Sequence, residues 1–229
     1  DPRLLCYDSC RESPLTHIVP FHHRRLFGPG TVNQYSPPEI RASPGDHVQK
    51  GAVMSNEQKY RFSWDLLGNI PLGRPNLGPR TRLEVYRLMQ FTLRDVLERH
   101  VGAGETDRIF LEAGRMAGVE FYRHFLGPFD SFSDFANSLQ AIFKEMDIGI
   151  LRFEQSDLDS CTFLLTVSED MDCSGLPELG YEICTYDEGF IAGLLEEYTG
   201  RPLEVQEIDC WCTGSRTCRF RARPAAPSA

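Results

Sequence analysis

Apolar residues recur at helical spacing in four stretches of the chain. Residues 83–97, 105–125 and 132–146 place apolar side chains three or four positions apart, which gathers them on one side of an α-helix. The fourth stretch begins after Cys184 and stops at Gly200, a residue type that often terminates helices. The pattern therefore predicts four helices.

Two of these stretches also predict how their helices pack. In the first, Val85, Leu88 and Phe91 widen the apolar stripe, which indicates burial on more than one side. In the second, Gly114 and Gly118 carry no side chain, so another helix can approach closely.

Alternating apolar and polar positions predict strands in other parts of the chain. Residues 148–153 and 161–167 form one such pair, and residues 203–212 and 218–223 form a second. The alternation changes parity near Glu207, which indicates a β-bulge.

Residues 60–72 alternate loosely and lead into a loop rich in glycine and proline, so we expect a short strand pair there. The whole order is then short strands, three helices, two strands, the helix after Cys184 and two final strands. This order predicts an α+β fold with a mostly antiparallel sheet covered by helices.

Four of the eight cysteines lie near the C-terminus. Cys184 precedes a helix, and a helix N-terminus favours the thiolate form of cysteine. Cys210 and Cys218 lie in the last two predicted strands, on either side of a tight turn. Helix end and strands can therefore bring three thiolates together. Three thiolates and one further donor make the closed tetrahedral set of a structural zinc ion.

The fourth zinc ligand is either Glu207 or Cys212. Cys212 lies on the same strand face as Cys210. The bulge near Glu207 can turn its carboxylate toward the side that carries Cys210. In either case the closed set leaves no position for a catalytic water, so we expect a structural role for the metal.

The set Cys184, Glu207, Cys210 and Cys218, with the tail CWCTGSRTCRF, resembles the C-terminal zinc motif of the 4-vinyl reductase domain family. The resemblance covers residues 60–223 and implies that these four residues bind zinc. The family includes aromatic-effector sensor domains of bacterial phenol- and xylene-responsive activators, and hydrocarbon-binding proteins. A ligand-binding fold with a C-terminal zinc site is thus implied. A cysteine at the position of Cys212 is a departure from the family's pattern.

Residues 1–53 differ from the rest of the chain. They hold seven of the 15 prolines and four of the six histidines, without helical or strand periodicity. Met54 opens a sequence typical of the start of a bacterial cytosolic protein. We expect residues 1–53 to be a disordered or spurious leader segment and residues 54–229 to be the zinc-containing ligand-binding domain. The alternative for the leader is a second metal site formed by His17, His22, His23, Cys6 and Cys10, which the irregular spacing disfavours.

Charge and composition narrow the class of protein. The net charge is −9, and residues 54–229 account for it because the charges of residues 1–53 nearly cancel. An acidic body disfavours binding to nucleic acid. No apolar run reaches the roughly 18 residues of a membrane span, so we expect no membrane insertion. A secretory signal is also missing from the sequence, which favours a reduced, cytoplasmic compartment over a disulfide-bonded fold.

The sequence predicts a binding function rather than an enzyme. It contains no nucleophile elbow, no HExxH motif and no dinucleotide-binding fingerprint, and we assign no catalytic residue. Aromatic residues on the helices and the sheet can enclose an apolar pocket. The ligand-binding candidates are Phe91, Phe121, Tyr122, Phe125 and Phe163.

The predicted protein is a sensor or regulatory domain for a small apolar or aromatic hydrocarbon. The alternative implied by the family resemblance is a tetrapyrrole vinyl reductase or a component of one. A redox switch at Cys212 or Cys173 is a third possibility, although the loop position of Cys173 favours a bystander.

The strongly apolar helices and the resemblance to sensors predict a homodimer. The chain carries no DNA-reading segment, so we expect any signal to pass to a separate partner.

Overall fold

The structure is a computed structural model that describes residues 58–226. The predicted leader, residues 1–53, lies outside this range and stays a prediction. The elements in chain order are η1 (Trp64–Leu67), α1 (Ile70–Gly73), α2 (Leu83–Val101), α3 (Ala103–Phe125), α4 (Phe132–Glu145), β1 (Ile150–Asp157), β2 (Thr162–Ser168), α5 (Thr185–Thr199), β3 (Leu203–Asp209), η2 (Trp211–Thr213) and β4 (Cys218–Pro224).

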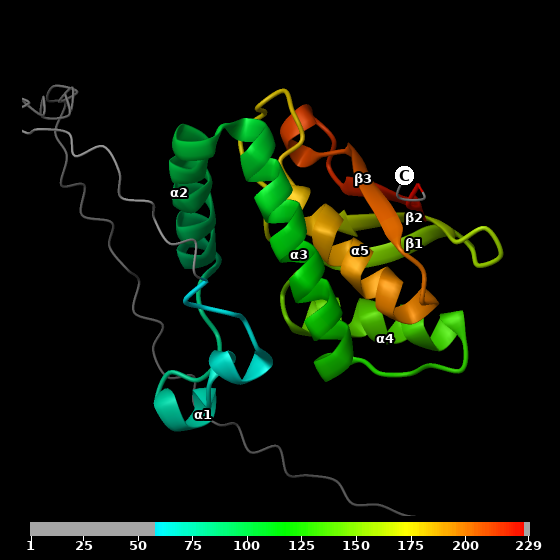
Figure 1. Cartoon of the computed structure of the whole chain (residues 1–229), viewed down its shortest axis with the longest axis horizontal. Helices are drawn as coiled ribbons and strands as arrows, with labels where there is room; N and C mark the ends of the chain where they lie inside the picture. Colours follow the sequence, from blue (N-terminus) through cyan, green and yellow to red (C-terminus); the bar gives the residue numbers. More distant parts are fainter. Residues whose placement is uncertain (1–57, 227–229) are drawn as a thin grey trace, which may run out of the picture. The chain divides into compact units, whose positions relative to one another are not determined.

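The strands form a four-stranded antiparallel sheet in the order β1-β2-β4-β3. One face of this sheet is buried, because β4 alternates Cys218, Phe220 and Ala222 inward with arginines outward. Helix α4 packs against β1 and α5 packs against β3, while α3 lies along α5 (Figure 1). The α+β class and the antiparallel sheet predicted from the sequence are confirmed.

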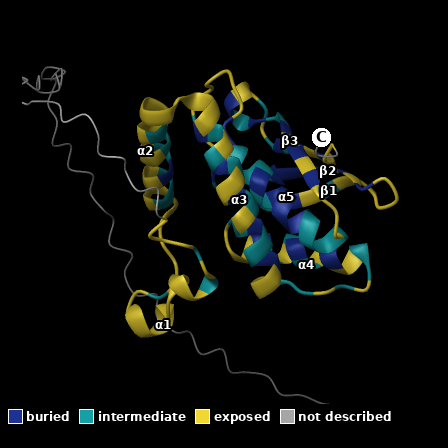
Figure 2. Ribbon diagram, viewed as in Figure 1, coloured by how far each residue is buried: buried dark blue, intermediate teal, exposed yellow. Residues whose placement is uncertain are grey.

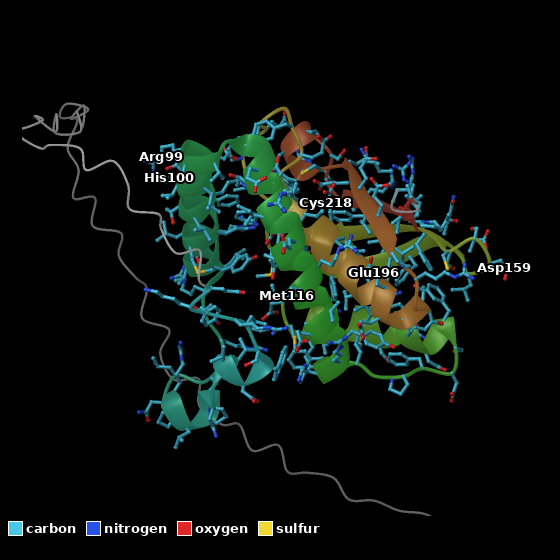
Figure 3. All side chains as sticks on the ribbon, in the orientation of Figure 1. Arg99, His100, Met116, Asp159, Glu196 and Cys218 are labelled. Atoms are coloured by element: carbon cyan, nitrogen blue, oxygen red, sulfur yellow. The ribbon has the colours of Figure 1, made fainter. Side chains whose placement is uncertain are left out.

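Helix α5 is the most buried of the helices in the described part of the chain. Leu194 and Leu195 are both 1% exposed although they are neighbours in sequence, because α3 and the sheet cover different sides of α5. Figure 2 shows α5 mainly in the colour of buried residues and α2 mainly in the colour of exposed ones. Glu196, labelled in Figure 3, ties α5 to its surroundings by accepting from the Leu203 amide and from Arg115 of α3.

Helices α3 and α5 touch backbone to backbone. A Cβ on Gly114 or Gly118 would overlap backbone carbonyls of α5, and a Cβ on Gly189 or Gly193 would overlap those of α3. The close contact predicted for Gly114 and Gly118 is confirmed, and the two glycines of α5 complete it. No larger side chain fits at this crossing without separating the helices.

Two sequence predictions about the N-terminal part are wrong. Residues 60–72 form two short helices instead of a strand pair, since Asn69 caps α1 by accepting from the Leu72 amide and Pro71 occupies its first turn. The helix at residues 83–101 is present, but its apolar residues are not buried on several sides. Val85 is 58% exposed and Leu88 is 67% exposed, because α2 packs on its neighbours along one narrow side.

In the part of the chain that the structure describes, every helix is too short or too polar to cross a lipid bilayer.

Candidate metal centre and apolar cavities

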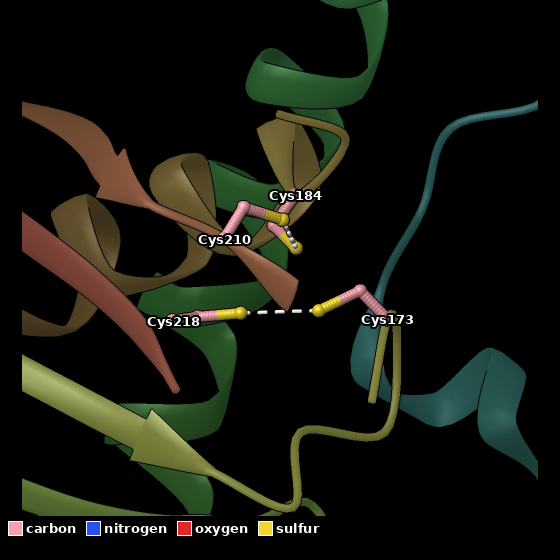
Figure 4. A group of neighbouring side chains, drawn as sticks. All are labelled: Cys173, Cys184, Cys210 and Cys218. Carbon is pink, nitrogen blue, oxygen red and sulfur yellow. Dashed lines mark hydrogen bonds between the residues drawn. The ribbon is translucent and has the colours of Figure 1, made fainter. Parts of the chain in front are cut away.

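Four cysteine sulfurs from four separate segments meet in the interior (Figure 4). Cys184 is the N-cap of α5, as its position before the helix predicted. Cys210 follows β3 directly and Cys218 opens β4. The fourth is Cys173, from the loop after β2. Each is at most 1% exposed, and the six cysteines of the described residues are free thiols.

The spacing of the sulfurs fits a tetrahedral metal ion. All four lie within 4.8 Å of one another; Cys184 and Cys210 are 3.9 Å apart, and Cys173 and Cys218 are 3.0 Å apart. Metal–sulfur bonds of about 2.3 Å at tetrahedral angles require sulfurs roughly 3.8 Å apart. A small outward movement of Cys173 and Cys218 therefore converts the group into a four-thiolate site. These residues can hold a metal.

Glu207 lies beside this group but is bound in another way. Its Oε2 accepts a hydrogen bond from the Cys184 amide at 3.3 Å, and its own amide donates to Glu188 at 2.7 Å. The other carboxylate oxygen, Oε1, is buried without a hydrogen-bond partner among the described residues. The strand register shifts between Glu207 and Asp209, so the predicted bulge is confirmed. Glu207 thus supports Cys184 and remains within reach of the thiols.

Cys212, the alternative fourth ligand, is buried in η2 but lies outside the four-sulfur group. Its carbonyl accepts hydrogen bonds from the amides of Leu179 and Gly180. The strand pattern suggested that Cys212 shares a face with Cys210. The chain instead leaves the strand at Cys210 and turns, so the two side chains no longer follow strand alternation.

The loop that carries Cys173 is held from both sides. Asp170 accepts from the Cys173 amide at 3.2 Å, and Arg87 of α2 donates to the carbonyls of Met171 and Ser174 at 2.7 and 2.9 Å.

Two further side chains of α2 reach the same loop. Tyr86 and Gln90 both donate to the Asp172 carboxylate, at 2.8 and 2.9 Å. The position of the fourth thiol therefore depends on α2, a helix that is distant in sequence.

Carboxyl groups around the thiols are strongly perturbed. Burial raises the pKa of Asp170 to about 7 and that of Glu207 to about 9. It also raises the pKa of Asp187 well above its ordinary value. Removal from water disfavours the charged forms, so these groups hold protons unless a positive charge is nearby.

The thiols perturb one another. Contact with Cys173, Cys184 and Cys218 lowers the pKa of Cys210, whereas contact with Cys173 and its neighbours raises the pKa of Cys184. The shared hydrogen bonds thus concentrate negative charge on Cys210 rather than on Cys184, which its helix position favoured. A bound cation would replace the protons that the other thiols hold.

Two apolar cavities lie close to this centre. The larger has a volume of about 350 Å³ and reaches from η1 to the Cys173 loop, with Trp64, Phe121, Met171 and Phe190 in its walls. Asp172 and Asp187 supply polar surface. The smaller cavity, about 190 Å³, lies between α2 and α3. Tyr86 and Tyr186 line both cavities, so their rings separate the two spaces.

The predicted ligand-binding aromatics occupy different places. Phe121 lines the larger cavity. Phe125 is 42% exposed and stands against Trp64, with ring centres 5.2 Å apart. Tyr122 and Phe163 are buried in the aromatic core, and Phe91 packs against that core from α2. The five do not surround one common space in the way the sequence pattern suggested.

Sequence reasoning missed Cys173 as a member of the thiol group and Tyr86, Arg87 and Gln90 as its supports. Cys173 lies in a loop without periodicity, so no spacing rule connects it with Cys184. The available signal was the acidic pair Asp170 and Asp172 just before it, since buried acids near a cysteine are unusual outside a site.

Fold and site together define an α+β domain with a buried thiol centre beside apolar cavities. Residues 163–224 match the family model of the 4-vinyl reductase domain. For this segment the resemblance to the 4-vinyl reductase domain family is confirmed.

Two relatives come from the archaeon Methanocaldococcus jannaschii. The uncharacterised protein MJ1642 is 26% identical over 147 residues, which cover 64% of this chain and 80% of that protein. The uncharacterised protein MJ0745 is 36% identical over 106 residues, which cover 45% of this chain and 51% of that protein. The bacterial origin expected from the sequence stays untested.

Solved structures with similarity to the chain include two of related description. The phenol-responsive sensory domain of the transcription activator PoxR, solved with phenol, has a TM-score of 0.49 and 15% identity, covering 65% of this chain and 78% of that one. A vinyl-4-reductase family protein from M. jannaschii has a TM-score of 0.45 and 18% identity, covering 65% of this chain and 85% of that one.

Proposed function

We propose that residues 58–226 form a small-molecule-binding sensory domain with a structural zinc ion. The observation that carries the proposal is the apolar cavity of about 350 Å³ whose wall includes the loop of the fourth thiol. A ligand in this cavity contacts Met171 and Asp172, which directly precede Cys173. Ligand and metal thus act on the same short loop.

Zinc is the proposed metal, and Cys173, Cys184, Cys210 and Cys218 are its proposed ligands. Four thiolates form a closed set typical of structural zinc, and such a set leaves no open position for substrate. Glu207 supports Cys184 through the amide hydrogen bond. Bound zinc would hold together the β2–α5 loop, the start of α5 and the ends of β3 and β4.

The proposed ligand is apolar or aromatic, with the size of one or two rings. Ring-bearing walls from Trp64, Phe121 and Phe190 favour burial of such a molecule. A homodimer and a separate signalling partner belong to the same proposal, since the exposed apolar stripe of α2 gives the domain a contact surface.

The test is native mass spectrometry and thermal shift of the zinc-loaded 229-residue chain with ethylbenzene, naphthalene, a fatty acid and a vinyl tetrapyrrole. We expect saturable binding of the aromatic hydrocarbons without turnover. Ala117→Leu fills the larger cavity and should weaken that binding at least tenfold. Ala113→Leu, one turn earlier on α3 and outside this cavity, is the matched control.

Equal binding by the wild type and Ala117→Leu would contradict the proposed ligand site. Reductant-dependent conversion of the vinyl tetrapyrrole would instead establish the enzyme alternative.

A further inference from the structure

The smaller cavity, between α2 and α3, has the size and walls of a separate ligand site. Its volume of about 190 Å³ compares with an apolar cavity of about 150 Å³ that is known to accommodate benzene. The space therefore fits one six-membered ring with a small substituent. Its apolar walls are formed by Met89, Leu93, Leu97, Ile109, Phe110 and Ala113.

One polar side chain, Gln90, interrupts these apolar walls from α2. Gln90 is 8% exposed, and its Oε1 has no hydrogen-bond partner among the residues the structure describes. A buried acceptor without a donor typically costs about 1–3 kcal/mol. A polar residue in this position thus requires a partner that the neighbouring protein atoms do not provide.

The orientation of the Gln90 amide is fixed from the other side. Its Nε2 donates to Asp172 Oδ2 at 2.9 Å, and the Tyr86 hydroxyl donates to Asp172 Oδ1 at 2.8 Å. Because the carboxylate accepts and the amide nitrogen donates, Gln90 cannot turn over without losing this bond. Tyr86 lines the cavity too, but its hydroxyl proton is already used. The free hydrogen-bonding capacity beside the cavity is therefore an acceptor.

We propose that the cavity between α2 and α3 is a second ligand site, selective for a neutral single-ring molecule that donates one hydrogen bond to Gln90 Oε1. The apolar walls contact the ring, and the hydroxyl or amino group meets the amide oxygen. Charged residues do not line the space, so ionised ligands lose their hydration without compensation. Gln90 is the specificity-determining residue of this site.

The site also has a direct connection to the thiol centre. The Gln90 amide that receives the ligand donates to Asp172, and Asp172 precedes Cys173. Occupation of the small cavity thus restrains the side chain that holds the Cys173 loop from α2.

The experiment compares matched pairs of probes on the zinc-loaded 229-residue chain by ligand-observed NMR titration. Phenol is paired with toluene, and cyclohexanol with methylcyclohexane, so that each pair exchanges a hydroxyl for a methyl group of similar size. We expect the donor in each pair to bind about tenfold more tightly, in line with one satisfied buried acceptor. Gln90→Met, which keeps the length of the side chain and removes the amide, should bind both members of a pair equally.

Two alanines of α3 separate this site from the larger cavity. Ala113→Leu fills the small cavity and should abolish the preference for donors, whereas Ala117→Leu fills the larger cavity and should leave that preference intact. Zinc content and melting temperature of each variant establish that it is folded.

The absence of a donor preference in the wild type would overturn the proposal. So would a preference that Ala117→Leu removes and Ala113→Leu retains, since the probes would then occupy the larger cavity. Loss of self-association in Ala113→Leu, with no probe bound by the wild type, would show that the groove receives a second copy of the chain instead. Hydrocarbon binding in the larger cavity is unaffected by any of these outcomes and stands or falls separately.

Discussion

Individual side chains decide whether the thiol group is a metal centre. Cys173 and Cys212 are both fully buried cysteines, yet only Cys173 belongs to the four-sulfur group. Glu207 differs from both, because its carboxylate already accepts from the Cys184 amide. The three positions therefore give three different expectations on substitution.

We predict that Cys173→Ser loses tight zinc binding whereas Cys212→Ser retains one zinc per chain. A serine hydroxyl is a poor replacement for a thiolate ligand. Metal analysis after gel filtration measures the stoichiometry of both variants. Zinc retained in Cys173→Ser but lost in Cys212→Ser would reverse the assignment of the fourth ligand.

Glu207→Gln should keep zinc at full stoichiometry but weaken its affinity by about 10- to 100-fold, the usual effect of removing a group that orients a ligand. Competition with a chromophoric chelator measures the affinity. Complete loss of zinc from this variant, with Cys173→Ser unaffected, would make Glu207 the ligand, as the family resemblance implied.

At the scale of secondary-structure elements, the crossing of α3 and α5 determines how the body is assembled. Four glycines let the two backbones touch, and α5 carries Cys184 at its N-terminus. Any separation of these helices therefore displaces one thiol from the other three. The same crossing explains why α5 is buried on several sides although its own sequence carries little amphipathic contrast.

We predict that Gly118→Ala destabilises the protein by about 1–3 kcal/mol or more, since the added methyl group overlaps the backbone of α5. Gly104→Ala is the matched control, because it lies on the same helix with open space around it. That change should be neutral or stabilising by up to about 1 kcal/mol. Chemical denaturation measures both free energies of unfolding, and equal effects would contradict the close crossing.

For the whole molecule, the thiol centre joins segments that the sheet alone does not hold. The loops before α5 and after β3 meet there, and Trp211 adds a hydrogen bond from its indole nitrogen to the Leu176 carbonyl at 2.9 Å. This indole reports on the joining of the two loops. Trp64 is the second tryptophan and lies in η1.

Removal of the metal should lower the melting temperature and change the fluorescence of Trp211. Structural zinc in small domains contributes about 10–16 kcal/mol at neutral pH, so the loss should be large. The measurement uses a chelator on a Trp64→Phe variant, followed by readdition of zinc, which should restore both signals. A chelated protein with unchanged melting temperature would exclude a structural metal.

Self-association is expected through the exposed stripe of α2. Val85 and Leu88 are exposed and lie on the side of α2 away from the small cavity, together with Val96, which is 40% exposed. Light scattering at micromolar concentration should find a dimer, and Leu88→Glu should make it monomeric. Unchanged mass in this variant would assign the contact to another surface.

The sequence by itself determined the elements with strong periodicity. Apolar spacing located the three long helices, the helix after Cys184 and the four strands, because one-sided burial leaves a regular pattern in any context. It also placed Cys184, Cys210 and Cys218 correctly at a helix end and at strand ends. The α+β class follows from that order of elements.

Tertiary structure decided what depends on contacts between distant segments. Cys173 joins the other thiols because Arg87 and Gln90 of α2 fix its loop, and no local pattern records such a contact. The exposure of Leu88 and the position of Phe121 at a cavity likewise depend on which neighbours cover each helix. Periodicity states that a side is apolar; only the packed molecule states whether protein, ligand or a second chain covers it.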